Sequence, residues 1–567
     1  MDRYSTLRET WRRKVTAALL ASFATIVSAC DLSIVDNVPA TPRDRVPNLR
    51  VVSAPESIPI AEQCGQLGLE LGTPDMDIGA GRADITLPAR TNQVEILVAP
   101  ATLDQSDTEY ILMQDVSAPG TAFEVTRSDI TFNLNGHTVT YGTNDSPDVP
   151  FPNGTAGIKV AWGQTDVVVA NGTIAQGSGA CQGDVSGRNC NPVMAQGGSG
   201  SVEIGGLMLS YHTPDTSGIV APVDGEIHHN TLIDSGNYLT YAGTGVPAIR
   251  AQANEIHHNL ILSARHRGIV PGNNSEVSYN EIHINSYQSN SYGIMAFEIQ
   301  GFTFHHNKIY GDGVHPIGIG PVGTGGTNGQ IYSNFIETEN SRTVAGTANG
   351  SSAFRITTYG GWCDSIEVMC NYFVSKGGNA HRELDGKSWG RTLWIGGFAQ
   401  GNTADIHHNY IQALTNDSSK YHSAVAVVSG GYNDGLFIED NVIVANHTVV
   451  ALADGYGASG LGYARFARNN FIRKDNYTTY RTVADKLNEY WDVTAMFMDN
   501  VYSNGADISS ATTEILYYCT SNKTELIFGH FSGSQPVVEY YLTDDPARVA
   551  AGSASEPFGA CGFKVIP

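Results

Sequence analysis

The chain has 567 residues, with 62 glycines, 9% aromatic residues and 16% charged residues. This composition excludes a disordered or collagen-like chain and favours many short strands joined by tight turns over a helical protein. The formal net charge of −23 repels polyanions from most directions, so we do not expect nucleic acid as a partner.

The first 30 residues combine a basic stretch, Arg12 to Lys14, with an apolar run from Val15 to Ala29. That run is too short for a lasting membrane span and is typical of a secretory signal. The run ends in Val-Ser-Ala-Cys at 27–30, which resembles the bacterial lipobox. The resemblance implies that residues 1–29 are a lipoprotein signal peptide and that Cys30 carries the lipid. An ordinary signal peptide with an incidental Cys is the alternative.

Acyl chains on Cys30 bury enough CH₂ groups to anchor a protein at a membrane surface. We therefore expect a lipid-anchored protein of the cell envelope, on the periplasmic or outer-surface side. Residues 30–60 are rich in Pro, Val and charge without periodicity, which predicts a tether. The repeat described next predicts a folded region over 61–505 with an N-terminal cap. The repeat is absent from 506–567, and we expect this segment to form a C-terminal cap.

A repeated frame, apolar-x-x-Asn-x-apolar, dominates the middle of the chain, as in IHHNLI at 256–261 and FHHNKI at 304–309. Its Asn residues lie 21 to 38 residues apart, at 230, 259, 280, 307, 334, 371, 409, 441, 469 and 500. A period of about 20–50 residues is typical of a solenoid. A second apolar strand recurs between these segments, with Ile at 249, 269, 294, 356 and 395 expected inside.

One coil cannot bury its apolar side, but coils stacked at about 4.8 Å align Ile over Ile and Asn over Asn. We interpret the Asn column as structural, because an Asn in a turn tolerates a left-handed backbone and can bond to the Asn above and below it. The pattern resembles the pectate-lyase-like superfamily over roughly residues 105–505. It predicts an all-β right-handed parallel β-helix of about 10–12 coils with terminal caps.

Seven cysteines remain after Cys30, in an oxidising compartment. Close spacing suggests the pairs Cys181–Cys190, Cys363–Cys370 and Cys519–Cys561, which leaves Cys64 without a partner. No CxxC motif is present in the sequence, so we do not expect a structural zinc site.

The superfamily resemblance implies a polysaccharide groove along the outer face of the sheet built by the second strand. Alternation along these strands predicts that Arg250, Arg355 and Trp394 point outward, with Arg267 and Tyr292 entering the same strands. An aromatic ring can stack on a sugar, and Arg pairs with a carboxylate or sulfate. We therefore predict that these five residues bind substrate. Packing beneath loops is the alternative.

A long insertion, KGGNAHRELDGKSWGRTLW at 376–394, is dense in titratable groups. If the substrate is a uronate glycan, β-elimination needs a base for the C5 proton and a cation facing the carboxylate. Lys387, Arg391, His266, His315 and His381 are the candidate catalytic residues. The polysaccharide lyases that this fold includes use similar chemistry, so a lyase acting on an acidic glycan is the leading functional hypothesis, and a noncatalytic scaffold that binds glycan or protein is the alternative.

A weaker similarity links GDGVHPIGIG at 311–320 and FRIT at 354–357 to polygalacturonases. An inverting hydrolase requires paired carboxylates. The coil before His315 carries no acid until Glu298, and Thr357 stands where that family has Lys. We therefore treat the similarity as shared coil geometry.

His pairs at 228/229, 257/258, 305/306 and 407/408 raise the possibility of a metal site. Neighbours in a strand point opposite ways, yet His228 over His257, or His229 over His258, would meet across one coil. The other two pairs lack such neighbours. We favour polar strand residues over a shared metal and predict no cofactor, since calcium has no compact acidic cluster to support it. We expect a monomer whose partners are a polysaccharide and a membrane.

Overall fold

The computed structural model describes residues 59–143, 154–179, 190–198, 200–213, 216–221, 224–235, 246–264, 267–285, 291–312, 315–320, 326–339, 352–357, 362–377, 389–396, 403–415, 421–428, 436–446, 448–452, 462–473, 483–485, 493–498, 501–503, 515–516, 525–532 and 535–542.

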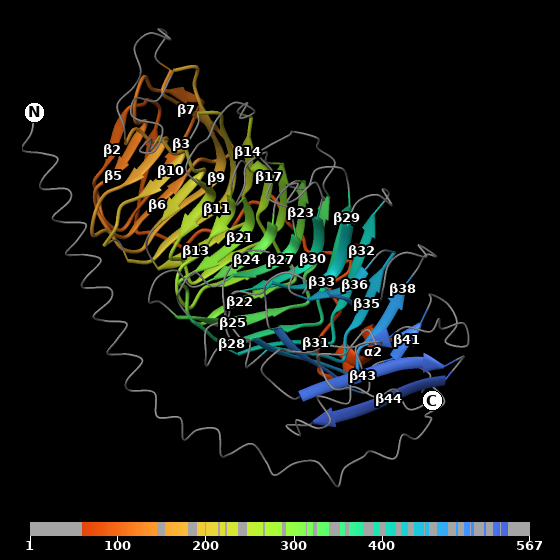
Figure 1. Ribbon diagram of the computed structural model, residues 1–567. Coiled ribbons are helices and arrows are strands. Elements are labelled where there is room, and N and C mark those ends of the chain that lie inside the picture. Colours follow the sequence, from red (N-terminus) through yellow and green to blue (C-terminus); the bar gives the residue numbers. More distant parts are fainter. Residues whose placement is uncertain are drawn as a thin grey trace, which may run out of the picture. The chain divides into compact units, whose positions relative to one another are not determined.

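Three short strands make up a typical coil, as in β15 (Pro247–Ala251), β16 (Glu255–His257) and β17 (Leu260–Ala264). Each strand pairs in parallel with its counterpart in the next coil. The first strand of every coil enters a 14-stranded sheet, and the other two enter a 27-stranded sheet. Stacked parallel strands of this kind confirm the predicted right-handed parallel β-helix (Figure 1).

The 14-stranded sheet holds β15 and, in addition, β2 (Ala101–Leu103), β5 (Phe123–Val125), β8 (Ile158–Val160), β10 (Val193–Ala195), β12 (Ile219–Ala221), β18 (Arg267–Val270), β21 (Tyr292–Phe297), β24 (His315–Gly320), β27 (Ser352–Thr357), β30 (Trp389–Gly396), β33 (Tyr421–Val428), β36 (Thr448–Leu452) and β39 (Val483–Asp485). These 14 strands exceed the 10–12 coils predicted. The first coils are hard to recognise in the sequence, because Gly172 and Leu207 occupy the position that later coils give to Asn.

Two rows of strands form the 27-stranded sheet, one before and one after the Asn turn. The row before the turn contains β16, β1 (Asn92–Ile96), β3 (Thr108–Leu112), β6 (Ile130–Asn133), β13 (Gly225–His228), β19 (Glu276–Ser278), β22 (Phe302–His305), β25 (Gly326–Tyr332), β28 (Trp362–Met369), β31 (Ala404–His407), β34 (Leu436–Glu439), β37 (Gly462–Ala467) and β40 (Val493–Met498). The row after it contains β17, β4 (Val116–Ser117), β7 (Thr138–Tyr141), β14 (Thr231–Asp234), β20 (Glu281–Asn285), β23 (Lys308–Asp312), β26 (Phe335–Glu339), β29 (Tyr372–Gly377), β32 (Tyr410–Thr415), β35 (Val442–Ala445), β38 (Asn470–Arg473) and β41 (Val501–Ser503). β9 (Val167–Gln176) and β11 (Val202–Tyr211) run through both rows.

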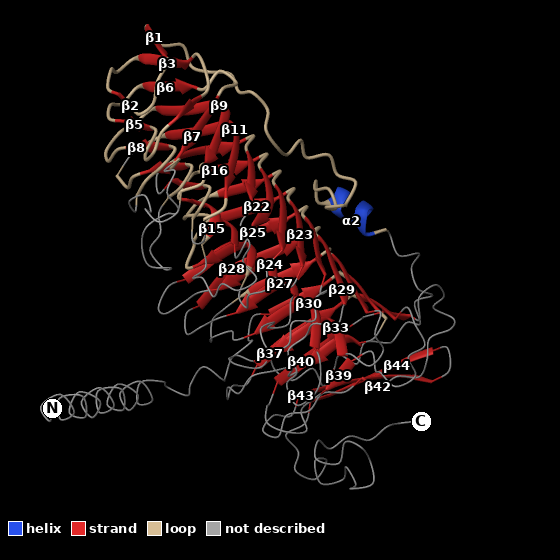
Figure 2. Cartoon of the chain, turned by 90° about the horizontal axis from the view of Figure 1, so that it is seen from above, coloured by secondary structure: helices blue, strands red, loops and turns tan. Residues whose placement is uncertain are grey.

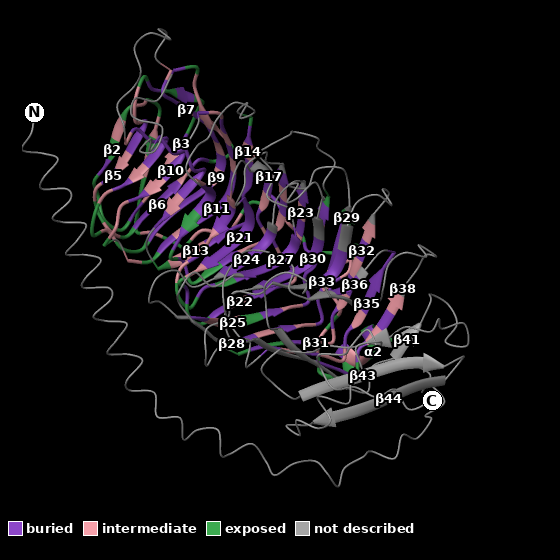
Figure 3. Ribbon diagram, viewed as in Figure 1, coloured by how far each residue is buried: buried purple, intermediate pink, exposed green. Residues whose placement is uncertain are grey.

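The core is built from aligned apolar side chains inside the coils. Figure 3 colours much of the described strands as buried. Ile227, Ile256 and Val277 stack in successive coils of one row, and each is fully buried. Ile249 and Ile269 stack in the same way in the 14-stranded sheet. Because side chains alternate along a strand, the same register that buries these residues turns their neighbours outward.

The Asn ladder is present, with one correction to the predicted geometry. Asn280 donates its side-chain N–H to Oδ1 of Asn307 at 3.0 Å, and Asn307 donates to Asn334 at 2.9 Å. The left-handed backbone, however, belongs to the residue before each ladder Asn, such as His306 with φ of 52°. This arrangement frees the Asn side chain to turn inward, where Asn280, Asn307 and Asn334 are fully buried.

Residues 59–91, which we call the axial arm, begin with α2 (Ile60–Gln66) and then run along the Asn-turn edge (Figure 2). The arm crosses the coils in reverse order. Its Gly72 donates a backbone N–H to Cys370 O at 3.0 Å, Gly81 donates to His258 O at 2.9 Å, and Arg90 contacts Asp166 at 2.8 Å. The arm therefore satisfies backbone groups that the turns would otherwise leave exposed.

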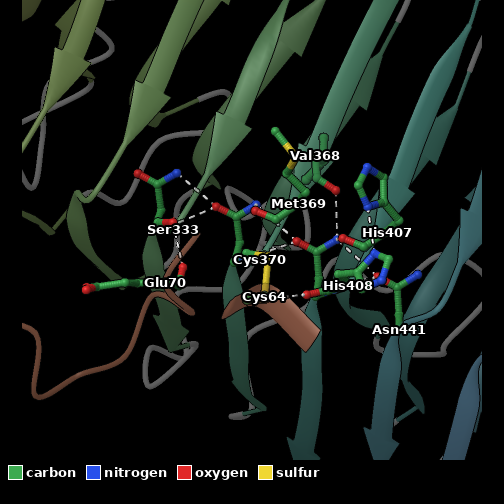
Figure 4. The surroundings of a disulfide bond; sticks show 12 residues. Cys64, Glu70, Ser333, Val368, Met369, Cys370, His407, His408 and Asn441 are labelled. Atoms are coloured by element: carbon green, nitrogen blue, oxygen red, sulfur yellow. Dashed lines mark hydrogen bonds between the residues drawn. A yellow bond between two sulfur atoms is a disulfide. The ribbon is translucent and has the colours of Figure 1, made fainter. Parts of the chain in front are cut away.

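A disulfide between Cys64 and Cys370 fixes the start of the arm (Figure 4). The predicted Cys363–Cys370 pair is therefore wrong. Nearness in sequence is misleading here, because Cys370 occupies the outward-facing turn position that the arm covers, whereas Cys363 lies in β28 and pairs with Thr327 through the sheet. Cys190 is also disulfide-bonded; Cys181, Cys519 and Cys561 lie outside the described residues, as does the predicted lipidation site Cys30.

An antiparallel sheet follows the last described coil and comprises β42 (Ile515–Leu516), β43 (Glu525–Ser532) and β44 (Gln535–Leu542). β43 contacts β40. Within the described ranges, no helix is both long and apolar enough to cross a bilayer.

Candidate functional site

The outer face of the 14-stranded sheet collects the residues predicted to bind substrate. Arg267 lies beside Tyr292 in the next coil, and Arg355 lies beside Trp394. Arg250 is in the coil before Arg267. The sheet register thus brings residues spread over 145 positions of sequence onto neighbouring strands, from β15 to β30.

Two arginines share the ring of Trp394. The Cζ atom of Arg355 is 4.1 Å from the ring centroid, and that of Arg391 is 4.6 Å from it. Arg355 also donates a hydrogen bond to the hydroxyl of Tyr292 at 3.1 Å. A desolvated guanidinium over Trp is worth about 2 kcal/mol, so the three side chains hold one another in place. We call Tyr292, Arg355, Arg391 and Trp394 the Arg–Trp cluster.

The Arg–Trp cluster is more buried than its outward direction predicts. Arg355 is 4% exposed, Arg391 is 6% exposed and Trp394 is 8% exposed. The indole that was predicted to stack on a sugar is in contact with two guanidinium groups. The side chains of Arg355 and Trp394 point away from the core, as alternation requires, yet they are buried from solvent.

Gly318 makes room for this cluster. A Cβ atom at Gly318 would lie 2.2 Å from two ring carbons of Tyr292, so the ring lies directly over the glycine. The Tyr292 side chain can therefore cross the strand that carries Gly318 and reach Arg355 on the far side. No motif in the sequence marks this glycine, because the clash arises only between neighbouring coils.

Arg250 and Arg267 form the accessible end of the face. Arg250 is exposed, and Arg267 is half-buried. Burial lowers the pKa of the Arg267 guanidinium, with a further lowering from Arg250 and a partial offset from Tyr292. Within the part of the chain that the structure describes, Nε of Arg267 has no hydrogen-bond partner.

Of the five catalytic candidates, only Arg391 has a described side chain. His315 pairs with Tyr292 through the backbone of β24, so it lies in the same sheet, but its side chain lies outside the described residues. His266, His381 and Lys387 also lie outside them.

A second cluster of titratable groups lines the Asn-turn edge. His228 and His229 approach through their Nδ1 atoms at 2.9 Å, and the pairs at 257/258, 305/306 and 407/408 do so at 2.7 to 2.8 Å. The expectation that adjacent His side chains point opposite ways is wrong. The second His of each pair adopts the left-handed turn conformation, and this turns its ring back toward the first.

A glutamate from the preceding coil contacts the first His of each pair. Glu203 lies 3.1 Å from Nε2 of His228, and Glu226 lies 2.7 Å from Nε2 of His257. The same arrangement recurs at His305 with Glu276 and at His407 with Glu367. The signal in the sequence is a Glu two residues before an outward His, as in Glu226-Ile-His228 and Glu255-Ile-His257.

Only the first two His pairs are stacked on each other. The rings of His228 and His257 are 5.1 Å apart, and those of His229 and His258 are 4.7 Å apart and almost parallel. This confirms the contact predicted across one coil. His305 instead lies between Ser278 and Tyr332.

Burial makes the second His of each pair hard to protonate. Burial, together with the nearby rings of His257 and His229, lowers the pKa of His258 to about 4. Burial followed by the neighbouring His likewise lowers the pKa of His229, His306 and His408. These imidazoles are therefore neutral at pH 7.

The fold and these two clusters define a parallel β-helix protein with a cationic, aromatic sheet face and a His-rich turn edge. Comparisons with protein-family models, curated proteins and solved structures found no match for this chain.

Proposed function

We propose that this protein binds an acidic polysaccharide along the outer face of the 14-stranded sheet and cleaves it by β-elimination in the cell envelope. The observation that supports the proposal is the gathering of four arginines, Tyr292 and Trp394 on one face, from β15 to β30. Planar guanidinium groups bind carboxylates and sulfates through paired hydrogen bonds, so a polymer with one such group per sugar suits a row of arginines.

Accessibility assigns different tasks to these arginines. Arg250 and Arg267, the more exposed pair, make the first contacts with the polymer. Arg355 and Arg391 are held by Trp394 and form the positively charged floor. A fixed cation facing the uronate carboxylate stabilises the enolate that forms when the C5 proton leaves.

The reaction requires a base beside that floor. His266, His315, His381 and Lys387 are the candidates from the sequence. The base removes the C5 proton, the C4–O bond breaks, a C4=C5 double bond forms, and the departing glycosidic oxygen takes up a proton. His315 is the most direct candidate, since β24 places it next to Tyr292.

The test is to incubate the purified protein with alginate, pectate and chondroitin sulfate and to follow unsaturated product by absorbance at about 235 nm. Arg391→Ala should abolish product and Arg267→Ala should weaken glycan retention at least tenfold. Arg127→Ala is the matched control, because Arg127 is exposed and lies outside this face, between β5 and β6. Absence of both product and glycan retention would overturn the proposal.

A noncatalytic glycan-binding scaffold is the second candidate. The observation that favours it is the burial of Arg355, Arg391 and Trp394, which are at most 8% exposed. Affinity electrophoresis in gels containing the same glycans distinguishes the two functions, because a scaffold is retarded by its glycan and releases no unsaturated product.

A further inference from the structure

The carboxylates at the Asn-turn edge determine where His228 and His257 carry their protons. An ionised carboxylate can only accept a hydrogen bond. Since Nε2 of His228 faces Glu203 at 3.1 Å and Nε2 of His257 faces Glu226 at 2.7 Å, both Nε2 atoms are donors. The neutral ring then keeps its lone pair on Nδ1. A histidine whose other nitrogen is held by a carboxylate is the usual state of a metal ligand.

The lone pairs of these two histidines face other imidazoles. Nδ1 of His228 is 2.9 Å from Nδ1 of His229, and Nδ1 of His257 is 2.7 Å from Nδ1 of His258. Without a cation, the two Nδ1 atoms of a pair must share one hydrogen bond, and Nδ1 of the second His must be the donor. A metal ion replaces that proton, and His229 then carries its own proton on Nε2.

Two such pairs in adjacent coils bring enough ligands together. One ring nitrogen from each of His228, His229 and His257 lies within 4.8 Å of the other two. Nitrogens bound to one tetrahedral Zn²⁺ are about 3.4 Å apart, as follows from Zn–N bonds of about 2.0–2.1 Å. Small side-chain rotations therefore close the site without a change in the strands.

We infer that His228, His229 and His257 bind one divalent transition-metal ion of the zinc and copper class, with Glu203 and Glu226 orienting the ligands. Imidazole is the ligand type that these ions prefer, whereas calcium prefers oxygen. His258 borders the site and lies against His229.

The axial arm holds the backbone of this site. Gly81 donates a backbone hydrogen bond to His258 O at 2.9 Å, and Ala83 donates one to His229 O at 3.3 Å. The Cβ position of Gly79 is 3.6 Å from the His258 ring. Ligands on a backbone that is bonded on both sides lose less freedom when they bind an ion.

The same fold offers an internal control. His305 and His306 form an identical pair with its own glutamate, Glu276. The coils on either side place Ser278 and Tyr332 in that column, so no third imidazole is in reach within the described coils. The inference therefore predicts metal binding at the first two pairs and not at this one.

The experiment uses the full-length chain, stripped with EDTA and titrated with Zn²⁺ alone by isothermal calorimetry. We expect one ion per chain, at least 100-fold weaker binding in His228→Ala/His257→Ala, and a change of less than threefold in His305→Ala/His306→Ala. Glu203→Gln/Glu226→Gln should weaken binding about 10–100-fold. Absence of one-to-one binding, or an equal loss in both double His variants, would overturn the inference.

A second measurement uses the wild-type chain, so it does not require that any variant folds. The chain titrated with one equivalent of Cu²⁺ should show electron paramagnetic resonance couplings from at least three imidazole nitrogens. Couplings from two nitrogens or fewer would contradict the site. This readout involves no glycan. A negative result would therefore contradict the metal site without contradicting the proposed polysaccharide function, and the reverse also holds.

Discussion

The Asn-turn edge and the outer face of the 14-stranded sheet use the same coil spacing in opposite ways. At the edge, successive coils repeat the same residue, so Asn280, Asn307 and Asn334 bond to one another in a continuous ladder. On the sheet face, neighbouring coils differ, and Tyr292 and Arg355 meet across a glycine. Repeating Asn in successive coils gives the same stabilising hydrogen bonds along the edge. Different residues in successive coils give the Arg–Trp cluster, which occurs at one place along the solenoid.

The two regions also differ in how they are covered. The turn edge is covered by the axial arm, which is tied to it by a disulfide and by backbone hydrogen bonds. The accessible end of the sheet face keeps Arg250 exposed. Substitutions in the Asn ladder and the arm should therefore act mainly on stability, and substitutions on the face mainly on binding.

The largest expected effect is at the ladder. Asn307→Ala removes the acceptor for both the backbone and side-chain N–H groups of Asn280. It also removes the side-chain donor to Oδ1 of Asn334, which keeps only the backbone N–H of residue 307. Buried groups left unpaired cost about 1–3 kcal/mol each, so we expect a loss of about 3–5 kcal/mol in the free energy of unfolding by urea titration.

The control for the ladder is Asn273→Ala. Asn273 accepts one hydrogen bond from the backbone of Gln300 at an exposed position. Its loss should cost less than about 1 kcal/mol. Equal losses in the two variants would mean that the ladder is not special.

The next effect concerns the arm. Cys64→Ala should lower stability by about 2–4 kcal/mol, the range for loss of a native disulfide. It should also speed hydrogen exchange in residues 59–91. Cys363→Ala is the matched control and should leave hydrogen exchange in residues 59–91 unchanged, because Cys363 lies in β28 and not at the arm. A nonreducing digest should contain a peptide linking Cys64 to Cys370, and recovery of a Cys363–Cys370 peptide would contradict this connection.

A smaller effect is expected on the sheet face. Gly318→Ala forces Tyr292 away from Arg355, because the added carbon would overlap the ring. Overpacking of this kind costs about 1–3 kcal/mol, and glycan retention should fall as well. Gly120→Ala should be close to neutral, since nothing lies within 4 Å of a Cβ there. Unchanged retention in Gly318→Ala would separate the Arg–Trp cluster from glycan binding.

The smallest effect is at the end of the arm, where Arg90 contacts Asp166 at 2.8 Å. The hydrogen bond from Arg90 lowers the pKa of Asp166, so this carboxylate contributes stability above its unfolded pKa and loses the contribution as the pH falls through the folded value. Asp166→Asn keeps a residue that tolerates the left-handed backbone and should cost about 0.5 kcal/mol at pH 7, since the pair is partly exposed.

The pH dependence makes this last prediction specific. Urea midpoints of the wild type and of Asp166→Asn should converge as the pH drops below about 4, near the ordinary pKa of an aspartate. A difference that does not shrink at all as the pH falls below 4 would show that the carboxylate charge is not what holds the arm.

Much of the fold could be predicted because its signals are local. Alternation placed Ile249 and Ile269 inside and Arg250 outside, and the Asn frame predicted which segments stack. The candidate site was predictable only in part. Direction away from the core follows from alternation, but the burial of Arg355 and Trp394 depends on contacts that form only in the folded chain.

By itself, the sequence determined the parallel β-helix, its inward apolar columns and its Asn ladder, because strand period and turn spacing are properties of neighbouring residues. Only the tertiary structure decided that Cys64 bonds to Cys370 across 306 residues, that the arm lies over the turns, and that paired His rings face each other. Those outcomes depend on contacts between coils and on a left-handed turn residue. Neither produces a periodic pattern in the sequence.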